Sequence, residues 1–314
     1  MNLELPFYTV LDDICKEKNI DSKILSFNWI IELKRGNEVH HIINSEFDLN
    51  TANSFAIAND KYATYIVLKE NNIPTIEHRM IFSPYTRSTL YSDELVREAK
   101  DLLKEYPKIV LKANFSSKGD DVSRCETEEE VNEIIRKYFD EEHKDSISAC
   151  PYVEIEYEYR AVVLNGEVIF IYKKRKPFVT GDGKSTVNEL IIKKQEELQI
   201  EYDLFKGLDL EYVPKENEEV VVSWKHNLSS GAEPILVDDT EDRIDYIKDI
   251  AIKSAKALNI SFATVDIART KENNILVMEV NGKVCMNKFM TFFGDDGYKM
   301  AKDIYTKAID AMFE

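Results

Sequence analysis

The chain has 314 residues, with 41 Lys or Arg against 58 Asp or Glu and a formal net charge of −17. This length allows a large core in two or three compact units, and the acidic balance disfavours nucleic acid and anionic membranes as partners. No apolar run reaches membrane-spanning length and no signal-peptide pattern opens the sequence, so we expect a cytoplasmic protein. The four cysteines lack metal-site spacing, and we expect them to be reduced, small buried hydrophobes.

In chain order, the first 75 residues mix helix and strand patterns, including a strand at 26–33. Helices are predicted at 92–99 and 127–139, and the second begins with a capping box formed by Thr127 and Glu130. Later helices are predicted at 243–258 and 298–313. The charged stretch 193–215 is typical of a helix followed by a solvated loop.

A β-rich run at 107–112 ends in Lys112 and leads into a polar loop, Ser116-Ser117-Lys118-Gly119. A lysine at a strand end can meet a phosphate, and the loop can aim backbone N–H groups at phosphate oxygens. The spacing is not that of a P-loop. A strand followed by an ordinary polar turn is the alternative interpretation.

Two β-rich runs, 151–164 and 167–175, flank Asn165-Gly166, which is a strong hairpin signal. Alternation along the first run puts Glu158 and Arg160 on one face and Tyr159 on the other. Further on, a Gly-Asp-Gly turn precedes Ser185, which we predict as a helix N-cap.

A second hairpin is predicted from two apolar runs, 262–267 and 275–281, joined by a polar turn at 269–274. Glu279 and Asn281 are two residues apart and share a face, and pairing can bring Asp266 beside them. Two carboxylates and an amide oxygen form a hard oxygen site that suits Mg²⁺. A solvated hairpin face is the alternative interpretation.

In this order, the segments resemble the ATP-grasp superfamily, and within it the ligase domain of cyanophycin synthetases and related glutathione-synthetase-like enzymes. The resemblance runs from about Asn44 to the C-terminus. The motifs that carry it are Ser54–Lys61, Asn72–Thr75, Tyr159-Arg160 with Val179–Thr186, Asn227–Gly231, and Asp266 with Glu279-x-Asn281.

The resemblance implies an α+β ATP-grasp fold that holds a nucleotide between two antiparallel sheets, with an N-terminal α/β unit. It implies three units: residues 1–75 as the N-terminal unit, 76–152 as a mobile lid, and 153–314 as the catalytic subdomain. It also implies an ATP- and Mg²⁺-dependent ligase that joins a carboxylate to an amine through an acyl phosphate and releases ADP and phosphate. Small-molecule or peptide substrates are the expected partners, and a homodimer is the assembly to test.

Carried over by motif, the nucleotide-binding positions are Lys61, Lys112, Ser116, Ser117, Gly119, Tyr152, Val153 and Glu158. The lysines are expected at the phosphates, the loop residues over them, the backbone of 152–153 at adenine, and Glu158 at the ribose. An exposed carboxylate is the alternative for Glu158.

Arg160 with Lys174 or Arg175 is expected to stabilise the transferred phosphate, and a basic strand face is the alternative. The resemblance places Mg²⁺ at Asp266, Glu279 and Asn281. It places the acceptor substrate at Asn227, Ser229 and Ser230. The neighbouring His226 is interpreted as a packing or capping residue rather than a base.

The sequence departs from the family pattern at Pro151 and Glu156, where a glutamate and a glycine are usual, and at 282–286, which follows the metal motif. Substrate specificity is therefore not inherited. Three functions are weighed: a ligase for amino acids or short peptides, a ligase that forms ester or amide crosslinks in a ribosomal precursor peptide, and a non-catalytic nucleotide-binding scaffold.

Overall fold

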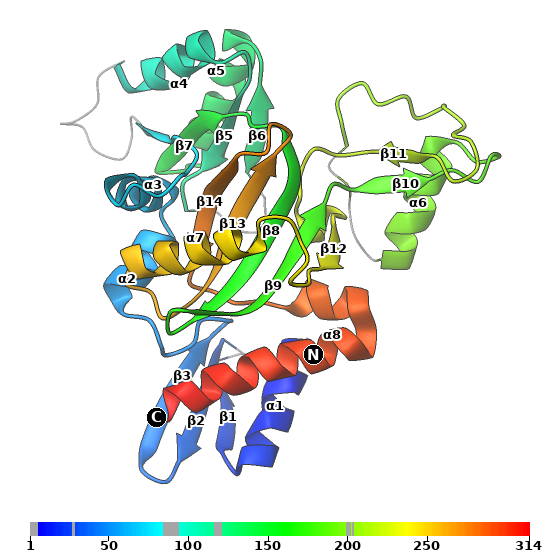
Figure 1. Cartoon of the computed structure of the whole chain (residues 1–314). Helices are drawn as coiled ribbons and strands as arrows, with labels where there is room; N and C mark the ends of the chain where they lie inside the picture. The colour runs from blue at the N-terminus through cyan, green and yellow to red at the C-terminus, as the bar shows by residue number, and fades with distance from the viewer. Residues whose placement is uncertain (1–5, 27–28, 84–93, 116–120, 199–201, 203) are drawn as a thin grey trace.

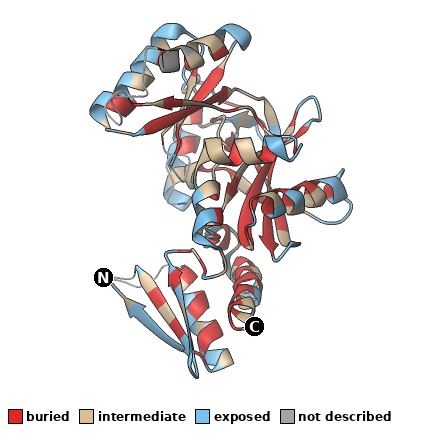
Figure 2. Cartoon of the chain, turned by 90° about the vertical axis from the view of Figure 1, so that its left-hand side faces the viewer, coloured by how far each residue is buried: buried red, intermediate tan, exposed pale blue. Residues whose placement is uncertain are grey.

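The computed structural model describes residues 6–26, 29–83, 94–115, 121–198, 202 and 204–314 (Figure 1). In this part of the chain the strands form four sheets, the two largest with five and four strands, and strands within each sheet pair in antiparallel fashion. Buried residues concentrate in the strands of the large sheets and along the helix faces that cover them (Figure 2). Helices and antiparallel sheets together confirm the predicted α+β class.

The N-terminal segment forms a helix and a three-stranded sheet of order β1-β2-β3. Its elements are α1 (Pro6–Lys18), β1 (Asp21–Leu25), β2 (Ile30–Arg35) and β3 (Glu38–Ile43). The last helix, α8 (Asn287–Met312), packs against α1, and the two share one apolar core. The predicted start at 298 was wrong, because the helix begins at Asn287 and bends at Gly294, whose φ of 56° interrupts it. The strand predicted at 26–33 also begins later, at Ile30.

Two short helices follow, α2 (Ala52–Ala58) and α3 (Lys61–Glu70), and each begins at a side-chain cap. Thr51 accepts a hydrogen bond from the Ser54 amide, and Asp60 accepts one from the Ala63 amide. Such caps satisfy N–H groups that have no partner inside the helix. Because Asp60 fixes the start of α3, Lys61 is its first residue.

The four-stranded sheet has the order β4-β7-β5-β6 and carries two helices. Its elements are β4 (Arg79–Phe82), α4 (Glu94–Glu105), β5 (Ile109–Ala113), β6 (Val122–Cys125), α5 (Glu128–Arg136) and β7 (Ser146–Pro151). Thr127 caps α5 as predicted. The helix ends at Arg136, however, and a π-helical turn at Lys137–Glu141 follows.

The five-stranded sheet has the order β12-β9-β8-β13-β14. Its strands are β8 (Ile155–Leu164), β9 (Glu167–Arg175), β12 (Glu233–Leu236), β13 (Phe262–Thr270) and β14 (Ile275–Asn281). Both predicted hairpins are confirmed. Asn165 and Gly166 take the positive φ angles, 48° and 84°, that a tight turn between β8 and β9 requires. Two boundaries were wrong: Pro151 belongs to β7 in the other sheet, and the second turn is shorter because β13 extends to Thr270.

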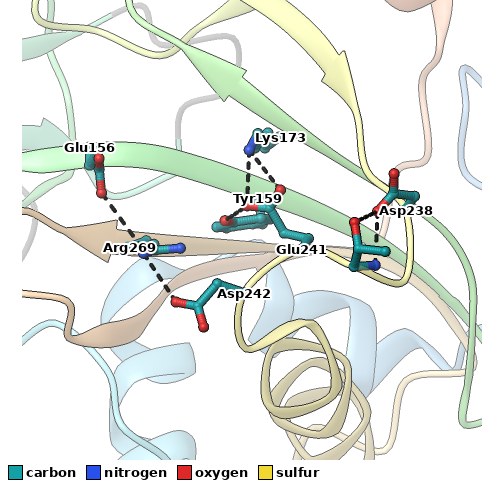
Figure 3. A network of polar contacts seen from close by, with 8 residues as sticks. Glu156, Tyr159, Lys173, Asp238, Glu241, Asp242 and Arg269 are labelled. Atoms are coloured by element: carbon teal, nitrogen blue, oxygen red, sulfur yellow. Dashed lines mark hydrogen bonds and ion pairs between the residues drawn. The ribbon is translucent and has the colours of Figure 1, made fainter.

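Helix α7 (Ile244–Ala257) covers one face of this sheet. Figure 3 shows how polar side chains fasten the loop before α7 to that face. Tyr159 donates to Glu241 at 2.5 Å, and Lys173 donates to the two oxygens of the same carboxylate at 2.9 and 2.7 Å. Arg269 pairs with Glu156 and Asp242 at 3.6 and 3.2 Å. These contacts, with α7, cover the face of the sheet that carries Tyr159 and Lys173.

A small lobe beside β9 is built from β10 (Phe178–Thr180), β11 (Glu219–Val221) and α6 (Val187–Leu198). The N-cap predicted at Ser185 was wrong by one residue. The Thr186 hydroxyl accepts a hydrogen bond from the Glu189 amide, and the Glu189 carboxylate accepts one from the Thr186 amide. The Ser185 hydroxyl instead donates to Asp182. The hydroxyl and the glutamate at the right spacing therefore select Thr186.

The cysteine prediction holds for three of the four residues. Cys15, Cys125 and Cys150 are buried, and burial raises the pKa of Cys15 to about 11 and that of Cys125 to about 12. Cys285 is exposed, because it lies in the connection between β14 and α8. The boundaries at 75 and 152 remain predictions.

Candidate active site

A row of polar side chains crosses the five-stranded sheet on the face opposite α7. Tyr172 on β9 lies opposite Arg160 on β8, which lies opposite Asp266 on β13, which lies opposite Glu279 on β14. Directly opposed residues in an antiparallel sheet point to the same face. The register alone therefore brings these four side chains together.

Arg160 and Asp266 form a bidentate ion pair. Arg160 Nε donates to Asp266 Oδ1 at 2.7 Å, and Arg160 Nη2 donates to Oδ2 at 2.5 Å. Lys174 joins the pair, because its Nζ contacts Glu158 and lies 3.7 Å from Asp266 Oδ1. Lys174 and Asp266 are each 2% exposed, and Glu158 is 8% exposed. The alternative of an exposed Glu158 carboxylate was therefore wrong.

The charges in this cluster shift one another's pKa values. Burial opposes ionisation of Asp266, but Arg160 and Lys174 outweigh it and hold the pKa of Asp266 well below its usual range. Burial is the larger effect on Glu158, whose pKa is raised although Lys174 counteracts it. Burial and Arg160 lower the pKa of Lys174, yet Asp266 and Glu158 raise it further. The two cations and the Asp266 anion are therefore the ionised forms near neutral pH.

The structure separates Lys174 from Arg175, which the sequence left open. Neighbouring residues on a strand point to opposite faces. Lys174 belongs to the charged cluster, whereas Arg175 stacks on the Phe178 ring at 3.5 Å and pairs with Glu219 at 3.0 Å. Lys174 is thus the cation that shares a cluster with Arg160.

The three residues predicted for Mg²⁺ lie side by side. Asp266 and Glu279 are in hydrogen-bonding contact, and Asn281 Nδ2 donates to Glu279 Oε1 at 3.0 Å. Two adjacent carboxyl groups with an amide oxygen fit a hard divalent cation, which would relieve their mutual repulsion. Arg160 supplies the positive charge against Asp266 here. Within the described ranges, no group of three His, Cys, Asp or Glu side chains is arranged to hold a metal by itself.

Two lysines lie near this region, one on the four-stranded sheet and one at the start of α3. Lys112 on β5 lies opposite Ser148 on β7, and Lys61 Nζ at the start of α3 lies 3.4 Å from the Asn114 carbonyl oxygen. Burial lowers the pKa of Lys61, while the Glu279 charge counteracts it and Lys112 adds to it. Lys61 therefore feels both the lysine of one sheet and the acid of the other.

An apolar patch connects the two sheets beside these charges. Ile76, Val110 and Cys150 are buried in it, and Tyr152, Val153, Trp224, Leu276 and Met278 pack against them. The Tyr152 and Trp224 rings meet edge to face at 5.8 Å. Such a patch suits a flat aromatic base. The Tyr152 amide already donates to the Lys108 carbonyl at 3.0 Å, so other groups of the 152–153 backbone would have to meet that base.

Sequence reasoning missed Trp224, Leu276, Met278 and Tyr172. A β-bulge in β14 next to Met278 shifts the register there. It lets Met278 join the apolar patch while Glu279 lies opposite Asp266. The alternation of apolar and acidic residues in β14 was the available sequence signal for these positions. The bulge, and with it the pairing of β14 with β13, could not be predicted from that alternation. Ser116, Ser117 and Gly119 lie outside the described residues.

The predicted acceptor residues form a tight turn next to β12. Asn227 Oδ1 accepts from the Ser229 amide at 3.3 Å and caps the short helix Leu228–Ser230. Gly231 follows with a φ of 90°. His226 is 5% exposed, and its Nε2 has no hydrogen-bond partner among the described residues. Burial, with Lys176 and Lys174, lowers the pKa of His226 to about 3, so the ring stays neutral.

Comparison with known proteins identifies the fold. Residues 223–304 match the family model of the RimK-like ATP-grasp domain. The chain aligns with the solved structures of a bifunctional glutathione synthetase from Pasteurella multocida (TM-score 0.58, 19% identity, 98% of this chain and 44% of that one) and of D-alanyl-alanine synthetase A from Vibrio cholerae (TM-score 0.59, 12% identity, 99% and 94%).

Relatives by sequence agree. The glutathione biosynthesis bifunctional protein GshAB of Listeria welshimeri is 28% identical over 287 residues, which are 83% of this chain and 34% of that protein. Cyanophycin synthetase of Synechocystis sp. is 27% identical over 252 residues, 72% of this chain and 27% of that one. The chain thus spans about a third or less of these relatives. The ATP-grasp fold and the resemblance drawn from the motifs are confirmed, and the expectation of an ATP-dependent ligase agrees with these relatives.

Proposed function

We propose that this ATP-grasp chain is an ATP- and Mg²⁺-dependent carboxylate–amine ligase that acts on amino acids or short peptides through an acyl phosphate. The observation that carries the proposal is the row Tyr172–Arg160–Asp266–Glu279, which adjoins Lys112 on a second sheet and Lys61 at the start of α3. Acids, cations and an apolar patch meet where two sheets meet, and these are the three environments that metal, phosphates and base require.

The nucleotide's two ends would meet different parts of this site. The apolar patch around Val110 and Trp224 suits the base, while Lys112 and Lys61 suit the phosphates. Arg160 and Lys174 lie on the neighbouring strands β8 and β9, where the γ-phosphate would face the second substrate. This order along the two sheets supports transfer of the terminal phosphate rather than simple nucleotide storage.

The proposed chemistry has two steps. An oxygen of the substrate carboxylate attacks the γ-phosphorus, the bond to the β–γ bridging oxygen breaks, and ADP leaves. The amine nitrogen then attacks the acyl carbon, the bond from that carbon to the phosphate oxygen breaks, phosphate leaves, and the ammonium loses a proton to solvent. Arg160 and Lys174 would neutralise the charge that develops on the transferred group. No covalent bond to the protein is needed.

Asp266, Glu279 and Asn281 would hold Mg²⁺, which supplies charge neutralisation to the phosphate oxygens when bound. Arg160 has a related role on the protein side. It now holds both oxygens of Asp266. We infer that Arg160 leaves this carboxylate when the site is loaded and turns to the transferred phosphate.

The test is the identity of the products. The full chain with ATP, Mg²⁺ and a panel of amino acids and dipeptides should release ADP and phosphate, and hydroxylamine should trap the acyl phosphate as a hydroxamate. Arg160→Ala should lower kcat more than it raises the KM for ATP, because its contact with phosphate is made mainly in the transition state. AMP and pyrophosphate as products, or an Arg160→Ala enzyme impaired only in ATP binding, would overturn the mechanism.

A further inference from the structure

A hollow lies at the β12 end of the same sheet face, beyond the charged row. It is open on one side and is lined mainly by Leu228, Ala232, Pro234, Lys288, Thr291 and Phe292. Pro234 lies directly opposite Lys174 in the β12–β9 register. One wall of the hollow is therefore the next strand over from a cation of the proposed active site.

The other wall is the first part of α8, which packs against aromatic residues of β9. Phe289 packs on Tyr172, with ring centroids 4.9 Å apart, and on Phe170 at 5.3 Å. Residues three and four apart share a helix face. Lys288, Thr291 and Phe292 consequently line the hollow together.

Lys288 is the charged residue among those that line this hollow. In the described part of the chain, no carboxylate lies within 4.0 Å of its Nζ. The β9 cation on the same sheet face, Lys174, is engaged with Glu158. Lys288 beside an apolar wall, in a chain of net charge −17, matches a ligand that is apolar and carries a carboxylate.

Sheet geometry sets the length of that ligand. Strand β8, which carries Arg160, and β12, which forms the wall, are separated by β9. Two strand spacings are about 10 Å. An extended peptide advances about 3.3 to 3.6 Å per residue, so roughly three residues cover this distance.

We propose that the hollow binds the C-terminal residue of a short peptide substrate, with an apolar side chain against Phe292 and Leu228 and the free carboxylate at Lys288. The inference rests on the proposed ligase function and names its acceptor. The peptide's amine would then lie near Arg160 and Lys174, where the acyl phosphate forms.

Binding of defined peptides tests this without turnover. The full chain, loaded with Mg²⁺ and a non-hydrolysable ATP analogue, is titrated by calorimetry with Gly-Gly-Leu, with its C-terminal amide, and with Gly-Gly-Ser. Gly-Gly-Leu should bind more tightly than the amide by about fivefold, the range of a solvent-facing ion pair. It should also bind more tightly than Gly-Gly-Ser, because leucine buries more apolar surface.

Lys288→Met should abolish the preference for acid over amide. Lys299→Met is the matched control, because Lys299 is an exposed lysine of the same helix that pairs with Asp296. An acid preference that persists in Lys288→Met, equal binding of acid and amide by the unchanged chain, or no peptide binding while the ATP analogue binds, would each overturn the inference and leave the ligase proposal standing. Failure of the ATP analogue to bind would instead count against the proposed function.

Discussion

Arg160 donates hydrogen bonds to both carboxylate oxygens of Asp266 on the neighbouring strand, and Lys174 Nζ lies 3.7 Å from Asp266 Oδ1. Arg160 thus depends on one buried acid, whereas Lys174 lies beside this acid and also contacts Glu158. Breaking a buried pair by removing one partner is costly, because the remaining charge stays buried without compensation. The same arrangement that suits phosphate transfer therefore also contributes to the stability of the sheet.

Asp266→Asn is expected to lower the free energy of unfolding by about 3 kcal/mol, because it leaves Arg160 without its bidentate partner and removes one of the two carboxylates beside Lys174. Urea denaturation measures this. Asp242→Asn is the control, since Asp242 pairs with Arg269 at a side-chain exposure of 62%, and it should cost less than about 1 kcal/mol. Equal losses in the two variants would contradict the assignment of a buried pair. Glu279→Gln should keep the unfolding free energy near that of the parent chain and remove turnover.

Lys174 and Arg175 provide a matched pair of adjacent cations. Lys174→Met should reduce kcat by at least about 100-fold, the scale of losing one group that stabilises developing charge. Arg175→Met should leave kcat within about threefold, because Arg175 faces Phe178 and Glu219 rather than the charged row. Steady-state ADP release measures both. If Arg175→Met were the more damaging change, the side of the strand assigned to phosphate would be the wrong one.

The sequence predicted the two hairpins well, because Asn165-Gly166 and the polar turn at 269–274 between two apolar runs are local signals. It also predicted which residues meet, since alternation places Glu158 and Arg160 on one face. It could not separate Lys174 from Arg175, because the register of β9 depends on pairing with β8 and β12. Nor could it find Trp224, which reaches the apolar patch through a loop.

Element boundaries failed for physical reasons as well. The helix predicted at 298–313 begins earlier, and α8 continues on both sides of the bend at Gly294, because Phe289 and Tyr305 both pack into one core. Pro151 continued an apparent strand in sequence, but it ends β7 and the chain then crosses to the other sheet. Tertiary packing and strand pairing determine both boundaries, and the local propensity of the residues does not encode these contacts.

Trp224 is expected to report nucleotide binding. Trp29 and Trp224 are the two tryptophans of the chain, and Trp29 is 55% exposed whereas Trp224 packs against Tyr152. In a Trp29→Phe variant, the emission should change when the ATP analogue and Mg²⁺ are added, because a base in the apolar patch would displace water from the indole. The Trp224→Phe variant should show no such change. A signal that survives Trp224→Phe and disappears in Trp29→Phe would place the nucleotide elsewhere.

His226 should make folding stability depend on pH in a defined window. The pKa of His226 in the folded chain is about 3, below the unfolded value of about 6.5. As the pH falls below 6.5, the unfolded state binds a proton that the folded state excludes, so stability is fully present above 6.5 and decreases toward pH 3. Between pH 7 and pH 5 this residue alone should account for about 2 kcal/mol.

Urea denaturation at pH 7, 6 and 5 tests this prediction by its slope, which is independent of any constant loss caused by the substitution. His226→Asn keeps a donor that can reach the Glu156 backbone, and it should reduce the loss between pH 7 and pH 5 by about 2 kcal/mol. His143→Asn, at an exposed position with a φ of 53°, is the control for replacing a histidine by asparagine. An equal slope in His226→Asn and the parent chain would mean that the His226 ring takes up a proton between pH 7 and pH 5 in the folded chain as it does in the unfolded chain. The assignment of a neutral imidazole beside Lys174 and Lys176 would then be wrong.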